Sequence, residues 1–133
     1  MKPVFADTSY YVALLGPRDA WHARAVEIAE SLLGQIFVTE YVLVELGSML
    51  SRGPDRQAYL TLLRDLESDS LVHIIPASTD LFRKGVQLFA SRPDKSWSLV
   101  DCISFVVMKQ RRLTEALTTD RHFKEAGFSV LLK

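Results

Sequence analysis

Short apolar segments alternate with amphipathic segments along the 133-residue chain, and this alternation restricts its fold more than any other feature. Apolar, β-leaning runs predict strands over residues 3–6, 36–39, 71–75, 115–119 and 128–132. Apolar residues at helical spacing predict helices over residues 8–16, 19–34, 40–53, 54–69, 78–92 and 98–112, with barely two turns over 120–127. Strands that alternate with helices pair in parallel. We therefore predict an α/β fold, a three-layer α/β/α sandwich with a central parallel sheet of about five strands, in a single domain over residues 1–133.

The composition argues against a chain that is basic overall or built around cysteines. The 16 Lys and Arg residues balance 16 Asp and Glu residues, so any contact with a polyanion must be local. Cys102 is the only cysteine, which excludes an internal disulfide and a thiolate metal cluster. No apolar run approaches the roughly 20 residues that span a bilayer, and no secretion signal opens the chain. We expect a cytoplasmic location and no membrane partner.

The three histidines, His22, His73 and His122, lie far apart in sequence. No two of them have the short, fixed spacing that is usual for zinc ligands. We therefore predict a surface or capping role for each histidine rather than metal binding.

Two acids stand at the predicted carboxyl ends of strands. Asp7 follows the first strand, and Asp120 follows the strand predicted over 115–119. In open parallel sheets, ligands bind outside this edge, where the following helices begin. Each acid also suits the N-cap of the next helix, so capping alone is the alternative for both.

Two further acids lie on predicted helices beside apolar residues. Asp101 stands three residues after Ser98 in "SLVD", which matches a capping box, but it also precedes the apolar run "CISFVVM". Glu45 follows Val42 by three residues and precedes Met49 by four, which places it beside the apolar stripe of its helix. No Lys or Arg lies within a turn of Glu45. A charged acid at such a position needs a partner or a cation, unless it reaches solvent at the rim.

Four acids that met at one edge of the sheet would raise each other's pKa values unless a cation lay among them. Carboxylate oxygens without His or Cys favour Mg²⁺ or Mn²⁺. We therefore predict one or two such ions at a site formed by Asp7, Glu45, Asp101 and Asp120. Such a site suits the attack of water on a phosphodiester, which leaves a 5′-phosphate and a 3′-hydroxyl.

The motifs "FADTSYYVALL", "TEYVLVEL", "DKSWSLVDCISF" and "LTTDRHF" resemble those of PIN-domain ribonucleases, specifically the small VapC-type toxins of toxin–antitoxin pairs. The resemblance runs over nearly the whole chain, and it implies a metal-dependent endoribonuclease. The neutral net charge favours a structured RNA as its substrate. The resemblance also implies a homodimer and a VapB-like antitoxin as partner. The residues that it implies as catalytic and metal-binding are Asp7, Glu45, Asp101 and Asp120, with supporting hydroxyls at Ser9, Ser98 and Thr119.

Substrate contacts are expected from a few cations in loops near the predicted edge. The candidates are Arg18, Arg92, Lys95 and Arg121, which could hold phosphates. Solvated loop charge is the alternative for each of them. Trp97 either stacks on an unpaired base or anchors its loop to the core.

Three other functions are weighed against the nuclease. A haloacid-dehalogenase-like phosphatase needs a second acid where Ser9 stands, and a receiver-type module needs adjacent acids after its first strand, where "FADTS" offers one. The remaining alternative is a PIN-like RNA-binding or antitoxin-binding module without nuclease activity. Chelator-sensitive cleavage of RNA distinguishes the enzyme from that module.

Overall fold

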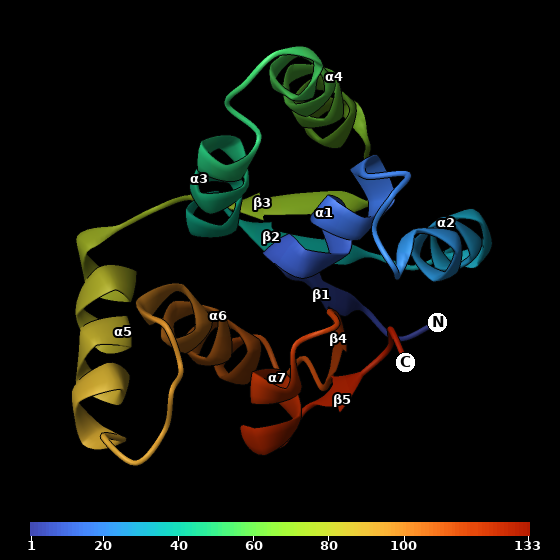
Figure 1. The fold of residues 1–133 in the computed structure, drawn as a ribbon. Helices are drawn as coiled ribbons and strands as arrows, with labels where there is room; N and C mark the ends of the chain where they lie inside the picture. Colours follow the sequence, from blue (N-terminus) through green and yellow to red (C-terminus); the bar gives the residue numbers. More distant parts are fainter.

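The computed structural model describes all 133 residues and contains one five-stranded sheet (Figure 1). Its strands are β1 (Val4–Ala6), β2 (Ile36–Thr39), β3 (Val72–Ile75), β4 (Glu115–Leu117) and β5 (Ser129–Val130). They lie in the order β3-β2-β1-β4-β5, and every neighbouring pair is parallel. The predicted α/β fold with a central parallel sheet is confirmed.

Helices cover both faces of this sheet. They are α1 (Thr8–Leu15), α2 (His22–Ser31), α3 (Glu40–Met49), α4 (Pro54–Ser68), α5 (Thr79–Ser91), α6 (Leu99–Gln110) and α7 (Arg121–Glu125). Because β1 is central and crossovers are right-handed, the connections toward β3 and those toward β5 pass on opposite faces. Figure 1 shows α1 to α4 on one side of the sheet and α5 to α7 on the other. The predicted three-layer arrangement is confirmed. None of the seven helices is long and apolar enough to cross a membrane.

Several predicted boundaries differ from the structure. The last two strands are shorter than predicted, because β4 ends at Leu117 and β5 covers only Ser129–Val130. The helix predicted over 19–34 occupies His22–Ser31, so Asp19, where the predicted helix begins, lies before it. The Asp19 carboxylate instead accepts a hydrogen bond from the Trp21 backbone N–H (2.8 Å), which closes a turn before the helix begins.

The core fixes α6 against the sheet and against α5. The aromatic ring of Phe105, on α6, packs edge-on against Phe123 and against Trp97, with centroids 4.9 and 5.0 Å away. Gly85, on α5, lets the two helices approach closely, since a Cβ there would lie 2.3 Å from a side-chain carbon of Ile103. The first turn of α6, which carries Asp101, is thereby held in place at the carboxyl edge of the sheet.

Candidate active site

One pocket of about 420 Å³ lies where β1 and β4 end and where α1, α6 and α7 begin. The backbone N–H of Asp7 donates to the carbonyl of Leu117 (3.0 Å), so the ends of these two strands are joined directly. The pocket is lined by all seven acidic and hydroxyl residues predicted for the site, which are Asp7, Glu45, Asp101, Asp120, Ser9, Ser98 and Thr119. The structure therefore brings the predicted residues together, and their chemical roles stay a prediction.

Asp7 is a buried acid, with 5% of its surface exposed. It occupies the N-cap position of α1, yet its side chain makes no capping hydrogen bond. One oxygen, Oδ2, instead accepts hydrogen bonds from the hydroxyls of Thr118 (2.8 Å) and Ser9 (2.9 Å). Burial raises the pKa of Asp7 to about 6, against the opposing effect of these two hydroxyls. Its other oxygen, Oδ1, accepts no side-chain hydrogen bond and is free for a ligand.

Thr118 and Ser9 connect Asp7 to the segment that carries Asp120. Thr118 is completely buried, and its hydroxyl accepts a hydrogen bond from the Asp120 backbone N–H (3.0 Å). The Ser9 hydroxyl accepts one from the Thr119 backbone N–H (3.0 Å). Thr119 was predicted to contribute a hydroxyl, but the hydroxyl that contacts Asp7 belongs to Thr118, and Thr119 contributes its amide. This network fixes the spacing of Asp7 and Asp120.

Asp101 forms the predicted capping box at the start of α6. Its backbone N–H donates to the Ser98 hydroxyl, and its Oδ2 accepts from the Ser98 backbone N–H, both at 3.0 Å. Only 8% of the residue is exposed, and burial raises its pKa while the hydrogen bond from the Ser98 amide acts in the opposite direction. Capping involves only Oδ2, so it leaves Oδ1 of Asp101 free for a ligand.

Asp120 and Glu45 complete the group of acids. Asp120 caps α7, because its Oδ1 accepts a hydrogen bond from the His122 backbone N–H (2.9 Å). Glu45 is half-buried on α3, and its Oε1 accepts a hydrogen bond from the Thr8 hydroxyl (2.5 Å). None of the four acids forms an ion pair with a Lys or Arg. The pocket thus concentrates acidic groups without a Lys or Arg to balance them.

Three side chains at the pocket could together hold a metal ion. Oxygens of Asp101 and Asp120 and a ring nitrogen of His122 lie within 4.8 Å of one another. Asp7 and Asp101 line a pocket that lacks Lys and Arg, so a divalent ion would offset the desolvation of their carboxylates. His122 lines this pocket, which a surface or capping role does not include, and the expectation that it does not bind a metal stays a prediction.

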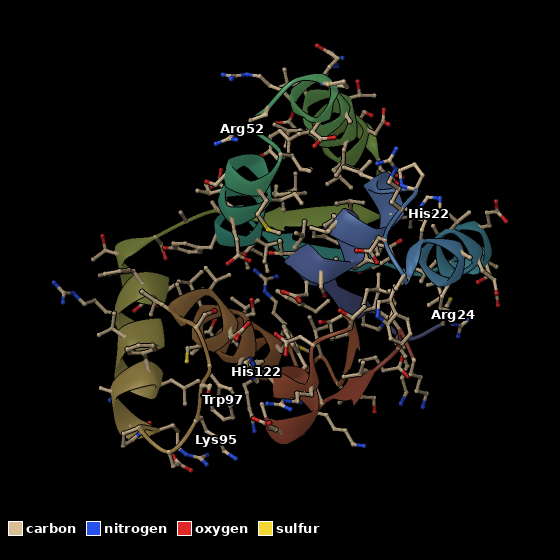
Figure 2. All side chains as sticks on the ribbon, viewed as in Figure 1. His22, Arg24, Arg52, Lys95, Trp97 and His122 are labelled. Atoms are coloured by element: carbon tan, nitrogen blue, oxygen red, sulfur yellow. The ribbon has the colours of Figure 1, made fainter.

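The other two histidines agree with the prediction. Nδ1 of His22 lies 2.8 Å from the carbonyl oxygen of Ala13, and the exposed ring of His73 stacks on Phe37. Figure 2 shows His22 at α2, apart from His122, which lies at α7. Only one histidine therefore belongs to the site.

None of the four predicted substrate cations lines the pocket. Arg92 forms two hydrogen bonds with Asp94, and Arg121 lies 3.8 Å from Glu125 with an exposed side chain. Arg18 is exposed in the turn after α1, and Lys95 lies with its Nζ 5.9 Å from the Trp97 ring centre. Their contact with substrate stays a prediction.

Trp97 anchors its loop and does not present a stacking surface. Only 6% of it is exposed, and its Nε1–H donates to Glu125 (3.1 Å). The guanidinium of Arg92 covers the ring at 5.2 Å from its centre. Figure 2 shows Trp97 and Lys95 together on the loop before α6. The base-stacking alternative for Trp97 is wrong, because the ring is covered.

Sequence reasoning missed Thr8, Thr118 and His122, and it missed Asp19, a fifth acid that lines the pocket. Thr8 and Thr118 are neighbours of predicted site residues, and an expectation that every buried carboxylate has a donor would have singled them out. The contact of His122 with Asp101 spans 21 residues, and no local pattern indicates it.

Comparisons with known proteins identify the family and the fold. The family model of the PIN domain matches residues 4–129. The 23S rRNA-specific endonuclease VapC20 of Mycobacterium tuberculosis is 26% identical over 125 residues, which cover 94% of this chain and 95% of that protein. The crystal structure of Mycobacterium tuberculosis VapC20, a sarcin-ricin loop cleaving toxin, matches with a TM-score of 0.85 over the same shares of both chains.

Two more distant structures share the fold. The FitAcB structure from Neisseria gonorrhoeae has a TM-score of 0.70 at 20% identity, and covers 96% of this chain and 95% of its own. The VapBC2 structure from Rickettsia felis, bound to a DNA fragment from its promoter, has a TM-score of 0.66 at 15% identity, with 96% of both chains covered. The same architecture thus persists at low sequence identity.

Proposed function

The chain belongs to the PIN domain family, and from this premise we propose that it is a metal-dependent endoribonuclease, the toxin of a VapBC toxin–antitoxin pair. The observation that carries the proposal is the pocket at the carboxyl edge of the sheet, where four acids meet without a Lys or Arg partner. The likeness to a VapC endonuclease over 94% of the chain supports the same reaction class.

We propose that Asp7, Glu45, Asp101 and Asp120 hold one or two Mg²⁺ or Mn²⁺ ions. When bound, such an ion lowers the pKa of a water molecule and neutralises charge on a phosphodiester. The chain's own residues fix the acids: the hydroxyls of Thr118 and Ser9 hold Asp7, and the Ser98 cap holds Asp101. Glu45, which accepts a hydrogen bond from Thr8, lines the same pocket, and we propose that it and Asp120 either bind the ion through water or orient the attacking water.

The proposed substrate is a structured RNA. The chain has no net charge, so tight binding to any strand is not expected, and recognition would depend on the shape of the RNA. Arg18, Arg92, Lys95 and Arg121 remain the proposed contacts to phosphates outside the pocket. Since the relative VapC20 acts on 23S rRNA, ribosomal RNA is the first substrate to test.

The proposed partners are a VapB-like antitoxin and a second copy of the chain, with residues 1–133 acting as one domain. Structures of toxin–antitoxin complexes share this fold, which supports the proposal of an antitoxin. Co-purification with the product of an adjacent reading frame tests the antitoxin, and light scattering of the purified chain tests the dimer.

The nuclease is tested by incubating the purified chain with ribosomal RNA in Mg²⁺, in Mn²⁺ and in excess EDTA, followed by sequencing of the RNA ends. We expect cleavage only with metal, and products that carry a 5′-phosphate and a 3′-hydroxyl. Asp7→Asn and Asp101→Asn should abolish cleavage, whereas Asp65→Asn, which changes an exposed acid on α4, should not. Cyclic phosphate ends, or full activity in EDTA, would contradict the metal-dependent reaction.

A further inference from the structure

We propose that His122 is a positioning residue of the acidic pocket, whose Nδ1–H holds Asp101 and Asp120 in the orientation that receives the metal ion. This inference rests on the proposed function, because it assigns a role within the same site. It concerns a residue that the four-acid description of the pocket leaves out.

The contacts of His122 bridge two of the acids. Its Nδ1 lies 3.1 Å from Oδ2 of Asp101 and 3.4 Å from Oδ1 of Asp120. Its backbone N–H donates to that same Oδ1 of Asp120 (2.9 Å). The side chain is only 20% exposed, so water competes weakly for these contacts. His122 therefore joins the first turn of α6 to the start of α7 at the pocket.

The chemistry of the partners decides which ring atom carries a hydrogen. Ionised carboxylates only accept hydrogen bonds, so Nδ1 facing two of them must be the donor. Both the neutral ring with its hydrogen on Nδ1 and the protonated ring satisfy this requirement. In either form of the ring, Nδ1 of His122 carries the hydrogen and donates it to the carboxylates.

The contact also determines which carboxylate oxygens remain available. Oδ2 of Asp101 already accepts the Ser98 backbone N–H at 3.0 Å, so a second donor at Oδ2 fixes the rotation of this carboxylate. Oδ1 of Asp101 is then the oxygen left for an ion. Donors in this outer position orient metal ligands, and their loss typically weakens metal affinity about 10-fold to 100-fold.

Direct ligation by His122 is the competing role, and the geometry favours positioning. Nδ1 faces the two carboxylate oxygens that also accept backbone hydrogen bonds, Oδ2 of Asp101 and Oδ1 of Asp120. It therefore contacts the side of each carboxylate that is turned to the protein, and the free oxygens lie elsewhere. Direct ligation predicts nitrogen bound to the ion, and positioning predicts none.

The test compares three substitutions at this position in the full chain, with Mn²⁺ alone as the probe. The amide nitrogen of His122→Asn occupies a place close to Nδ1, whereas that of His122→Gln lies near the other ring nitrogen, and His122→Ala removes both. Mn²⁺ affinity is measured from the electron paramagnetic resonance signal of the free ion. Nitrogen bound to the ion is detected by electron spin echo modulation. His73→Asn serves as the control, because His73 lies on β3 outside the pocket.

We expect His122→Ala and His122→Gln to bind Mn²⁺ about 10-fold more weakly than the wild type, and His122→Asn to recover most of that loss. His73→Asn should bind like the wild type, and the wild-type complex should show no directly bound nitrogen. Comparison of the Asn and Gln variants stays informative even if the Ala variant folds poorly.

Two results would overturn the positioning role alone: equal Mn²⁺ affinity in all three variants and the wild type, or nitrogen bound directly to Mn²⁺. A wild-type chain that binds no Mn²⁺ and cleaves no RNA would overturn the proposed function together with this inference. The two failures are therefore distinguishable.

Discussion

Replacing Asp7 by Asn should make the metal-free protein more stable at neutral pH while it abolishes cleavage. The buried carboxylate is charged in a place where no Lys or Arg balances it. Asn keeps an oxygen that accepts the hydrogen bonds from Thr118 and Ser9, and its amide nitrogen takes the place of the free Oδ1. The substitution therefore removes the charge and preserves the packing.

The magnitude follows from the pKa of Asp7, which burial raises from 3.8 to about 6. Each unit of difference between folded and unfolded pKa corresponds to about 1.4 kcal/mol, so the ionised carboxylate lowers the free energy of unfolding by about 3 kcal/mol. For a chain of this size, that amount corresponds to a change in Tm of roughly 10 °C.

The sign of the pH dependence is a separate check. Since the folded pKa lies above the unfolded one, the folded state binds the proton more tightly, and the cost of Asp7 is present in full only above about pH 6. It shrinks as the pH falls and disappears below about pH 4, where Asp7 is protonated in both states. Asp7→Asn should therefore gain about 3 kcal/mol at about pH 8 and only about 1 kcal/mol at about pH 4.5.

Thermal and urea unfolding in EDTA at these two pH values measures the difference between variant and wild type. Asp65→Asn, on the exposed face of α4, should change stability little at either pH and serves as the control. If Asp7→Asn were less stable than the wild type at about pH 8, or if its gain did not depend on pH, the buried charge would not be the cause and the reasoning would be wrong.

Three further predictions follow from other contacts. Addition of Mn²⁺ should raise the Tm of the wild type, as measured by thermal unfolding, but not that of Asp7→Asn, because binding to the folded state alone stabilises it. Thr118→Val should lower stability by about 1–3 kcal/mol in urea unfolding, because it leaves the partly buried Asp120 amide without an acceptor. Thr119→Val removes a hydroxyl that makes no hydrogen bond, so it should cost less. Gly85→Ala should lower stability by about 1–3 kcal/mol, since its Cβ would collide with Ile103, whereas Arg83→Ala on the exposed face of α5 should be nearly neutral.

Local patterns predicted the features of the site that depend on neighbouring residues. The "SLVD" capping box appears in the structure with both of its hydrogen bonds, because all of its atoms lie within one helical turn. Asp7 and Asp120 were placed at one edge because parallel strands end together, and β1 and β4 are indeed neighbours. Periodicity and sheet topology were sufficient for these predictions.

The residues that were missed or misplaced depend on details that periodicity does not specify. The resemblance to PIN-domain ribonucleases implies a supporting hydroxyl at Thr119, in a strand that is predicted to run to residue 119. In the structure β4 stops at Leu117, so the hydroxyl of the next residue, Thr118, turns inward to Asp7. Arg18, Arg92, Lys95 and Arg121 were predicted to reach the substrate because their loops lie near the edge of the sheet. The conformation of each loop depends on contacts such as that between Arg92 and Asp94, which the sequence pattern does not specify.

The local alternatives and the metal hypothesis for the acids turn out to be compatible. Asp101 and Asp120 each use one oxygen to cap a helix, and Asp7 uses one oxygen for two hydroxyls. A carboxylate has two oxygens, so these hydrogen bonds fix the orientation of each acid and leave the other oxygen for a ligand. The capping hydrogen bonds thus orient the carboxylates that would bind the ion. Because no Lys or Arg lies in the pocket, the buried negative charge destabilises the folded chain until a cation binds. The two experiments therefore test one hypothesis, that the oriented acids destabilise the metal-free chain and bind the cation. The stability of metal-free Asp7→Asn measures the destabilisation, and the Mn²⁺ affinity of the His122 variants measures the binding.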